Sequence, residues 1–159
     1  MIHLVIPMLP PSTNHAYENI PGHGGRRLSA KGRRFKLETR VHISRNYPKE
    51  LQYLKPNRPY AVLCTLYFKN LFTLGYPKKA KNRYKEIDGT NYAKLIEDAL
   101  CEATGVDDSQ FFPFIPLKTE GSPERTELRI WDLEEEEPFI ELIAFPKQMH
   151  LATRYNIQL

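Results

Sequence analysis

Apolar and polar residues alternate along this chain in patterns that predict both strands and helices. Short β-rich runs predict strands at residues 2–6, 60–69, 114–119, 126–133 and 140–145. The run at 60–69 is the most continuously apolar, so we expect it to be a central strand. Residues 30–45 and 91–104 predict two main helices. The expected fold is a single α+β domain, a mixed β-sheet packed by two main helices.

Both predicted helices carry residues that favour helix ends. Ser29 and Thr90 are good N-caps, and Gly105 suits the C-terminal end of the second helix. The buried stripe of that helix is predicted to be Tyr92, Leu95, Ile96, Ala99, Leu100 and Ala103. The opposite stripe contains Asn91, Lys94, Asp98 and Cys101, so these side chains share one face. Lys94 and Asp98 could simply form an ion pair there.

Three connecting segments separate these elements. Residues 7–14 are rich in proline and predict an ordered loop, and residues 46–59 predict a connection. Residues 70–87 form a long loop, and loops of this length in compact domains tend to be functional or mobile.

Composition narrows the class of protein. The chain has 159 residues, of which 41% are hydrophobic and 26% charged, as in an ordinary globular domain. No apolar run is long enough to span a membrane, and the N-terminus lacks a basic leader, so we expect a cytoplasmic protein without membrane contact. Cys64 and Cys101 form no Cys-x-x-Cys pair and predict reduced core residues. No nucleotide-binding loop is present, and no small-molecule cofactor is expected.

Charge is distributed unevenly along the chain. Residues 132–141 hold six of the 19 acidic residues, which leaves 23 basic against 13 acidic residues elsewhere. The basic residues gather in two clusters: Arg26, Arg27, Lys31, Arg33, Arg34, Lys36 and Arg40, and then Lys78, Lys79, Lys81, Arg83 and Lys85. Such clusters attract polyanions, so nucleic acid is the natural partner, although a merely solvated basic face is the alternative. The acidic segment could fold back on the basic surface or keep the protein soluble.

Carboxylates flank the second predicted helix. Glu86 and Asp88 precede it, and Asp107 and Asp108 follow it, so the two groups meet only if the chain turns back after Gly105. Carboxylate oxygens suit Mg²⁺ or Mn²⁺, which can promote phosphodiester hydrolysis. The alternative is that these residues are ordinary turn and cap residues.

Four short motifs follow one another along the chain. They are Pro-Pro-Ser-Thr-Asn at 10–14, Leu-Ser-Ala-Lys-Gly at 28–32, Asp-Gly-Thr-Asn-Tyr-Ala-Lys at 88–94 with a following Asp-Ala-Leu, and Val-Asp-Asp-Ser-Gln at 106–110. In this order they resemble the signatures of the RusA family of Holliday junction resolvases: Pro-Pro-Ser-x-Asn, a helix-opening segment, Asp-x-Asp-Asn-x-x-Lys and Asp-Asp-x-Gln. These are small endonucleases associated with phages and prophages.

The resemblance implies a Mg²⁺-dependent homodimer, with Mn²⁺ as a substitute. It implies that the protein binds four-way DNA junctions in recombination and repair and nicks two strands symmetrically, leaving 5′-phosphate and 3′-hydroxyl ends. By motif position, Asp88 and Asp108 would be catalytic metal ligands, Asp107 would be an adjacent candidate ligand, and Lys94 would be the essential lysine beside the scissile phosphate.

One motif position departs from the family pattern. Thr90 stands where the family has its second Asp, and an alternative alignment makes Glu86 and Asp88 the carboxylate pair. An inactive binder of branched DNA with the same fold is therefore the second hypothesis, and a structural or RNA-binding protein is the third.

The resemblance also sets the expected domain limits and DNA contacts. It covers about residues 1–131 as the endonuclease domain, and residues 132–159 are expected to be an acidic and apolar extension packed on the same domain. The residues predicted to bind DNA are Asn14, Arg26, Arg27, Lys31, Arg33, Arg34, Lys79, Lys81, Arg83, Asn91 and Lys118.

Overall fold

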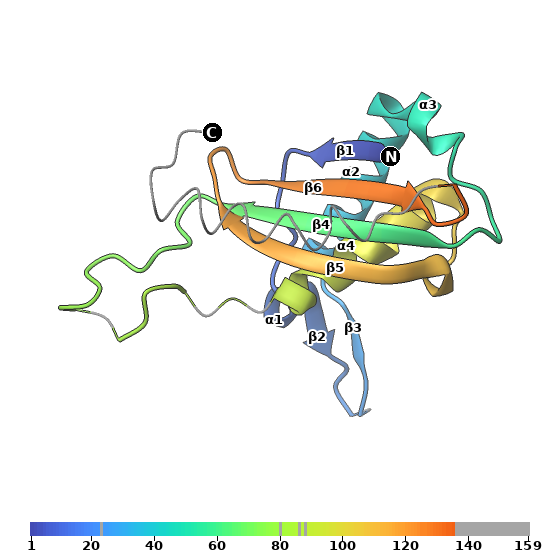
Figure 1. Cartoon of the computed structure of the whole chain (residues 1–159). Helices are drawn as coiled ribbons and strands as arrows, with labels where there is room; N and C mark the ends of the chain where they lie inside the picture. Colours follow the sequence, from blue (N-terminus) through green and yellow to red (C-terminus); the bar gives the residue numbers. More distant parts are fainter. Residues whose placement is uncertain (23, 80, 86, 88, 136–159) are drawn as a thin grey trace, which may run out of the picture.

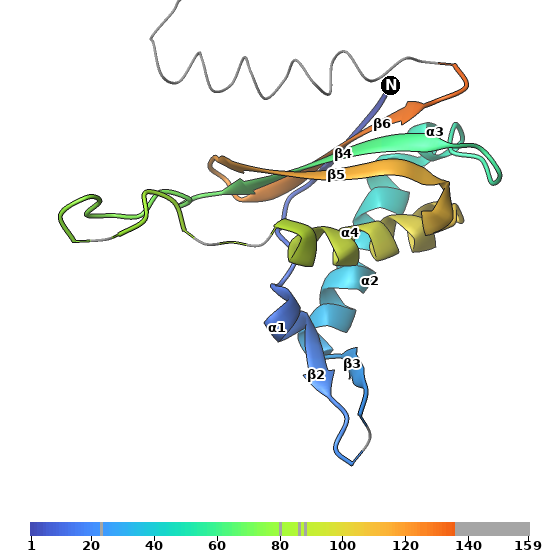
Figure 2. The ribbon, with the colours of Figure 1, turned by 60° about the horizontal axis from the view of Figure 1, so that its bottom comes forward.

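A four-stranded mixed sheet with two main helices on one of its faces forms the body of the protein. Figures 1 and 2 show this arrangement in a computed structural model, which describes residues 1–135 apart from residues 23, 80, 86 and 88. The sheet strands are β1 (Ile2–Ile6), β4 (Tyr60–Phe68), β5 (Phe111–Glu120) and β6 (Arg125–Asp132), and the main helices are α2 (Ala30–Asn46) and α4 (Gly89–Thr104). The predicted α+β fold is therefore confirmed.

Smaller elements lie between these. They are α1 (Thr13–Ala16), β2 (Tyr17–Asn19), β3 (Arg26–Leu28), α3 (Pro48–Leu51) and the 3₁₀ turn η1 (Asp108–Gln110). Strands β2 and β3 pair as a separate hairpin that projects from the body (Figure 1). α1 begins within the segment expected to be a proline-rich loop, and α3 lies within the segment expected to be a plain connection.

The strand order in the sheet is β1-β6-β4-β5. β4 pairs in parallel with β5 and antiparallel with β6, and nearly every residue of β4 is buried, which confirms the predicted central strand. β5 begins at Phe111, earlier than expected, because Phe111 already pairs with Tyr60. Pro113 argues against so early a start, and β5 tolerates this proline because the strand lies at the edge of the sheet.

The core lies between the sheet and the two helices. α4 contributes the fully buried Leu95, Ile96, Ala99 and Leu100, which confirms the centre of the predicted apolar stripe. α2 contributes Phe35 and Ile43, also buried. None of the described helices is long and apolar enough to cross a membrane.

Most predicted helix ends are confirmed, with one correction. The Ser29 hydroxyl accepts a hydrogen bond from the Gly32 amide at 3.1 Å, and Gly105 has a φ of 74°. The assignment of Thr90 as N-cap was wrong, because α4 begins at Gly89 and Thr90 lies inside its first turn. A Cβ at Gly89 would lie 3.6 Å from Lys118 and 3.7 Å from Pro116, so the first turn of α4 lies next to β5. The strand predicted at 140–145 lies outside the described residues.

Candidate active site

The two N-terminal motifs pack against each other. The Ser29 amide donates to the Ala16 carbonyl at 2.8 Å, and the Ser29 hydroxyl donates to the His15 carbonyl at 2.6 Å. Gly32 permits this contact, since a Cβ at that position would lie 2.5 Å from the Ala16 carbonyl oxygen. The motif that contains Asn14 is thereby joined to the basic first turn of α2, and the Asn14 side chain is exposed.

The polar face of α4 carries the closest charge cluster of the predicted site. Lys94 Nζ lies 3.0 Å from Asp108 Oδ2, 3.3 Å from Glu97 Oε2 and 3.4 Å from Asp98 Oδ1. The predicted ion pair between Lys94 and Asp98 is thus confirmed. The structure adds Asp108, which is distant in sequence and reaches the same ammonium group.

A turn after α4 brings Asp108 back toward the helix. The Thr104 hydroxyl accepts a hydrogen bond from the Val106 amide at 3.1 Å, and Val106 is buried. Asp107 then caps η1, and its carboxylate accepts the Ser109 amide at 3.0 Å. The hydrogen bonds from Ser109 lower the pKa of Asp107. This local role agrees with the cap alternative for Asp107, while Asp108 is left to face Lys94.

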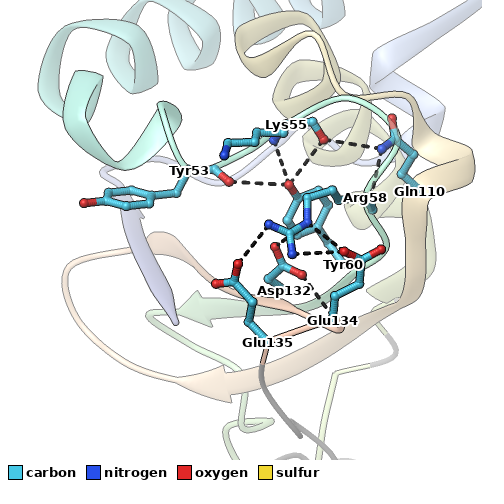
Figure 3. A network of polar contacts seen from close by, with 8 residues as sticks. All are labelled: Tyr53, Lys55, Arg58, Tyr60, Gln110, Asp132, Glu134 and Glu135. Carbon is cyan, nitrogen blue, oxygen red and sulfur yellow. Dashed lines mark hydrogen bonds and ion pairs between the residues drawn. The ribbon is translucent and has the colours of Figure 1, made fainter.

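Gln110 anchors the turn to a neighbouring loop, as Figure 3 shows. Its side-chain oxygen accepts from the Asp107 amide at 3.2 Å, and its Nε2 donates to the Arg58 carbonyl at 2.9 Å. The Arg58 guanidinium in turn binds Asp132 at 3.1 Å, Glu134 at 3.0 Å and Glu135 at 2.9 Å. The predicted C-terminal extension begins with these three acidic residues. In the described part of the chain they form ion pairs with Arg58 and not with either basic cluster.

The pKa values of Lys94 and Cys101, at the charge cluster, are raised. The hydrogen bond to Asp108 raises the pKa of Lys94 above its ordinary value, so its amine is a permanent cation at physiological pH. Burial, with added repulsion from Asp108, Glu97 and Asp98, raises the pKa of Cys101 to about 11. Neither cysteine forms a disulfide; Cys64 is buried and Cys101 is half-buried, which agrees with the prediction of reduced thiols.

The carboxylates beside α4 fit a hard divalent cation in their chemistry. Asp98, Asp107 and Asp108 line part of an open groove of about 400 Å³, and oxygen donors are what Mg²⁺ and Mn²⁺ prefer. Among the described residues, no group of three His, Cys, Asp or Glu side chains is arranged to hold a metal ion. The predicted ligand set depends on Asp88 and Glu86, which both lie outside the described residues, so it stays a prediction.

Lys118 lies beside the segment that leads into α4. Its ammonium donates to the Ile87 carbonyl, and its Cγ lies 3.6 Å from the ideal Cβ position of Gly89. Lys118 therefore sits at the start of the helix that carries Lys94. Asn91 lies in the same region of α4, and its side chain is outside the described part of the chain.

The basic side chains predicted to bind DNA are exposed, and most of them lie in two separate regions of the protein. Arg26 and Arg27 lie on β3, and Lys31, Arg33 and Arg34 lie on the first turns of α2. Some are engaged in exposed ion pairs, such as Arg27 with Glu18 and Arg34 with Glu38, which are weak enough to exchange for phosphate. Lys79, Lys81 and Arg83 are exposed on the 70–87 loop, which projects in another direction (Figures 1 and 2).

Sequence reasoning missed three residues that shape this site. Glu97 is the third carboxylate at Lys94, and its i, i+3 spacing from Lys94 was the available signal. Gln110 was recognised as part of a motif but not as the anchor of the turn. Nothing in the sequence pointed to Arg58, because its partners are far away along the chain.

Comparison with known proteins agrees with this geometry. The model of the family described as endodeoxyribonuclease RusA matches residues 7–131, which is most of the chain. No curated protein matches the chain. The matched segment includes the joint between α1 and α2, all of α4 and the turn that carries Asp108. This chain therefore belongs to the RusA family of Holliday junction endodeoxyribonucleases.

Proposed function

We propose that this protein resolves four-way DNA junctions as a homodimer, using Mg²⁺ or, as a substitute, Mn²⁺. It nicks two strands symmetrically and leaves 5′-phosphate and 3′-hydroxyl ends. Nucleases of this family are generally metal-dependent. The observation that carries the proposal is the contact of 3.0 Å between Lys94 and Asp108, which joins the two motifs expected to form the catalytic centre.

Asp108 and Asp88 are the proposed ligands of the metal ion, with Asp107 and Glu86 as adjacent candidates. When bound, such an ion activates a water molecule and offsets the charge that develops on the phosphodiester. Asp108 is well suited to this role because its carboxylate is half-exposed and opens onto the groove beside α4.

Lys94 is the proposed electrostatic partner of the scissile phosphate. Three carboxylates, those of Glu97, Asp98 and Asp108, surround its ammonium group, and their negative charge favours the protonated amine. A phosphate oxygen that approaches Asp108 comes within reach of this ammonium. Lys94 then stabilises the negative charge that builds up in the transition state.

Substrate binding is assigned to basic and amide side chains outside this centre. The proposed contacts are Asn14, Arg26, Arg27, Lys31, Arg33, Arg34, Lys79, Lys81, Arg83, Asn91 and Lys118. Each phosphate contact releases a counterion, so binding must weaken as salt rises. A homodimer is proposed because a two-fold arrangement offers two equivalent sites to a junction of approximate two-fold symmetry.

The test is cleavage of a synthetic mobile four-way junction with Mg²⁺ or Mn²⁺, beside a linear duplex. The wild type should give paired, symmetric nicks on the junction, and Asp108→Asn should abolish them, because the amide removes the charge of a ligand. Junction binding by Asp108→Asn should stay close to that of the wild type. Glu50→Gln, a matched change on α3 outside the cluster, should cut normally.

Three results would contradict parts of this proposal. Loss of junction binding in Asp108→Asn with unchanged metal affinity would remove Asp108 from the metal site. Tight junction binding without nicks in either metal would favour the hypothesis of an inactive binder of branched DNA. That hypothesis is based on Thr90, which stands where the family has its second Asp. Binding without preference for branched over linear DNA would favour the third hypothesis, a structural or RNA-binding protein whose basic clusters attract polyanions of any shape.

A further inference from the structure

The loop between β4 and α4 is a projecting arm with an ordered base. We call residues 70–87, without residues 80 and 86, the 70–87 arm. At its base the Thr73 amide donates to the Arg83 carbonyl at 2.9 Å, and the Lys85 amide donates to the Leu71 carbonyl at 3.0 Å. Phe72 pairs with Tyr84, and their rings lie 5.0 Å apart. Two antiparallel segments therefore support the distal part of the arm, which extends well away from the sheet (Figures 1 and 2).

The arm exposes apolar side chains that the core does not use. Four of the eight large hydrophobic side chains that are exposed in the described part of the chain lie on it. Phe72 and Tyr84 stack on each other at the base, but Leu74 is 91% exposed and Tyr76 is 48% exposed beyond them. Exposed apolar side chains that gather on one segment are typical of a surface that contacts a partner.

The charge of the arm restricts what that partner can be. Lys78, Lys79, Lys81, Arg83 and Lys85 are all exposed, and residues 70–85 contain no Asp or Glu. The partner must therefore offer dense negative charge next to flat apolar surfaces. DNA with unstacked bases meets both conditions, because its phosphates are anionic and every base has an apolar face.

The position of the arm connects it to the candidate active site. The arm leaves the sheet after β4 and returns to the start of α4, where the Ile87 carbonyl is held by Lys118. Lys94 lies further along the same helix. The base of the arm therefore joins the helix that carries the proposed catalytic lysine, and DNA bound along the arm would lead toward that helix.

We propose that two exposed apolar side chains beyond the base of the 70–87 arm, Leu74 and Tyr76, which we call the tip, recognise the branch point of the junction by contacting bases that are unstacked there. This rests on the proposed function. In a linear duplex every base is stacked, and inserting an apolar wedge requires that a base step be opened. At a branch point, opening a base step requires less free energy than it does in a linear duplex. The tip then determines the preference for branched DNA, whereas the lysines and Arg83 bind phosphates of any DNA.

The test separates these two contributions with three variants. The tip variant is Leu74→Ser with Tyr76→Ser, the charge variant is Lys79→Ala with Lys81→Ala, and the control is Tyr53→Ser, a tyrosine that is 69% exposed outside the arm. Binding to a four-way junction and to a linear duplex is measured in EDTA across a salt series. The junction carries 2-aminopurine at the branch point, whose fluorescence rises when the base unstacks.

The tip variant should lose about tenfold in junction affinity, as expected for lost base stacking, with duplex affinity unchanged. It should also lose the rise in 2-aminopurine fluorescence that the wild type produces. The charge variant should weaken both DNAs and lower the salt slope by about two, since two phosphate contacts are removed. Tyr53→Ser should match the wild type, and equal melting temperatures of all variants would show that they fold.

Other results would overturn the inference, and they are distinguishable. If the wild type prefers and cuts junctions while the tip variant keeps the same preference and the same fluorescence change, the role of the tip is wrong and the proposed function stands. If the tip variant changes the oligomeric state, the tip contacts a second copy of the chain instead. If the wild type neither prefers nor cuts junctions, both proposals fail.

Discussion

Gly32→Ala should destabilise the protein, although helix propensity alone predicts the opposite. Gly32 lies in the first turn of α2, and alanine is about 1 kcal/mol more favourable than glycine inside a helix. The structure reverses this expectation. The new Cβ would lie 2.5 Å from the Ala16 carbonyl oxygen and 3.1 Å from Leu28 Cδ2.

The Ala16 carbonyl cannot move away from the new Cβ without weakening a hydrogen bond that it already accepts. It already accepts the Ser29 amide at 2.8 Å, and that bond joins α1 to α2. Overpacking of this kind costs about 1–3 kcal/mol, and weakening the hydrogen bond adds about 1 kcal/mol. After subtraction of the propensity gain, the free energy of unfolding should fall by about 1–3 kcal/mol. For a chain of this length that lowers Tm by roughly 2–12 °C.

Thermal unfolding of the full chain, followed by circular dichroism, measures this change. Gly24→Ala is the matched control, because a Cβ there has no atom within 4 Å. Its free energy of unfolding should stay within about 0.5 kcal/mol of the wild type. A Tm for Gly32→Ala equal to or above that of the wild type would refute the reasoning, since propensity would then outweigh the contact with α1.

Two further predictions concern the turn that carries Asp108. Alkylation of Cys101 by iodoacetamide, followed by mass spectrometry, should accelerate with rising pH and reach half of its maximal rate at about pH 11, because burial and the nearby carboxylates disfavour the thiolate. This pH is the midpoint of the rate profile. Asp108→Asn should shift that midpoint to lower pH, and a midpoint near the ordinary thiol value in the wild type would contradict the geometry. Gln110→Leu removes the side-chain hydrogen bonds to the Asp107 amide and to the Lys55 and Arg58 carbonyls, so it should cost about 1–3 kcal/mol of stability and raise the Mg²⁺ concentration needed for half-maximal cleavage. Junction affinity should not change in that variant, and an unchanged Mg²⁺ requirement would mean that the turn keeps Asp108 in place without Gln110.

The C-terminal end of the described chain shows how the acidic segment begins. Arg58 binds Asp132, Glu134 and Glu135, so this part of the acidic run is held at the loop before β4. The same loop accepts the side chain of Gln110 through the Arg58 carbonyl. The acidic segment and the turn that carries Asp108 are therefore attached to one loop. That residues 132–159 pack on the domain as a whole stays a prediction.

Most elements of the fold could be predicted because their signals are local. Periodicity places α2, α4 and β4 within a few residues. Ser29 marks a helix start because its hydroxyl accepts a backbone amide, and Gly105 marks a helix end because glycine adopts a positive φ easily. The errors arise where tertiary contact overrides such preferences. The start of α4 is one case, since its first turn lies next to β5. The early start of β5 is another, since an edge strand accepts prolines that argue against a strand in isolation.

The candidate site divides in the same way between sequence and structure. The helical repeat alone puts Lys94 and Asp98 on one polar face, and the order of the motifs alone indicates the RusA family, because both depend only on positions along the chain. No local rule brings Asp108 to Lys94, ties Gln110 to the loop at Arg58 or makes Gly32 the contact point of two motifs. These contacts join residues that are distant in sequence, and they form only when packing of the helices on the sheet brings their segments together.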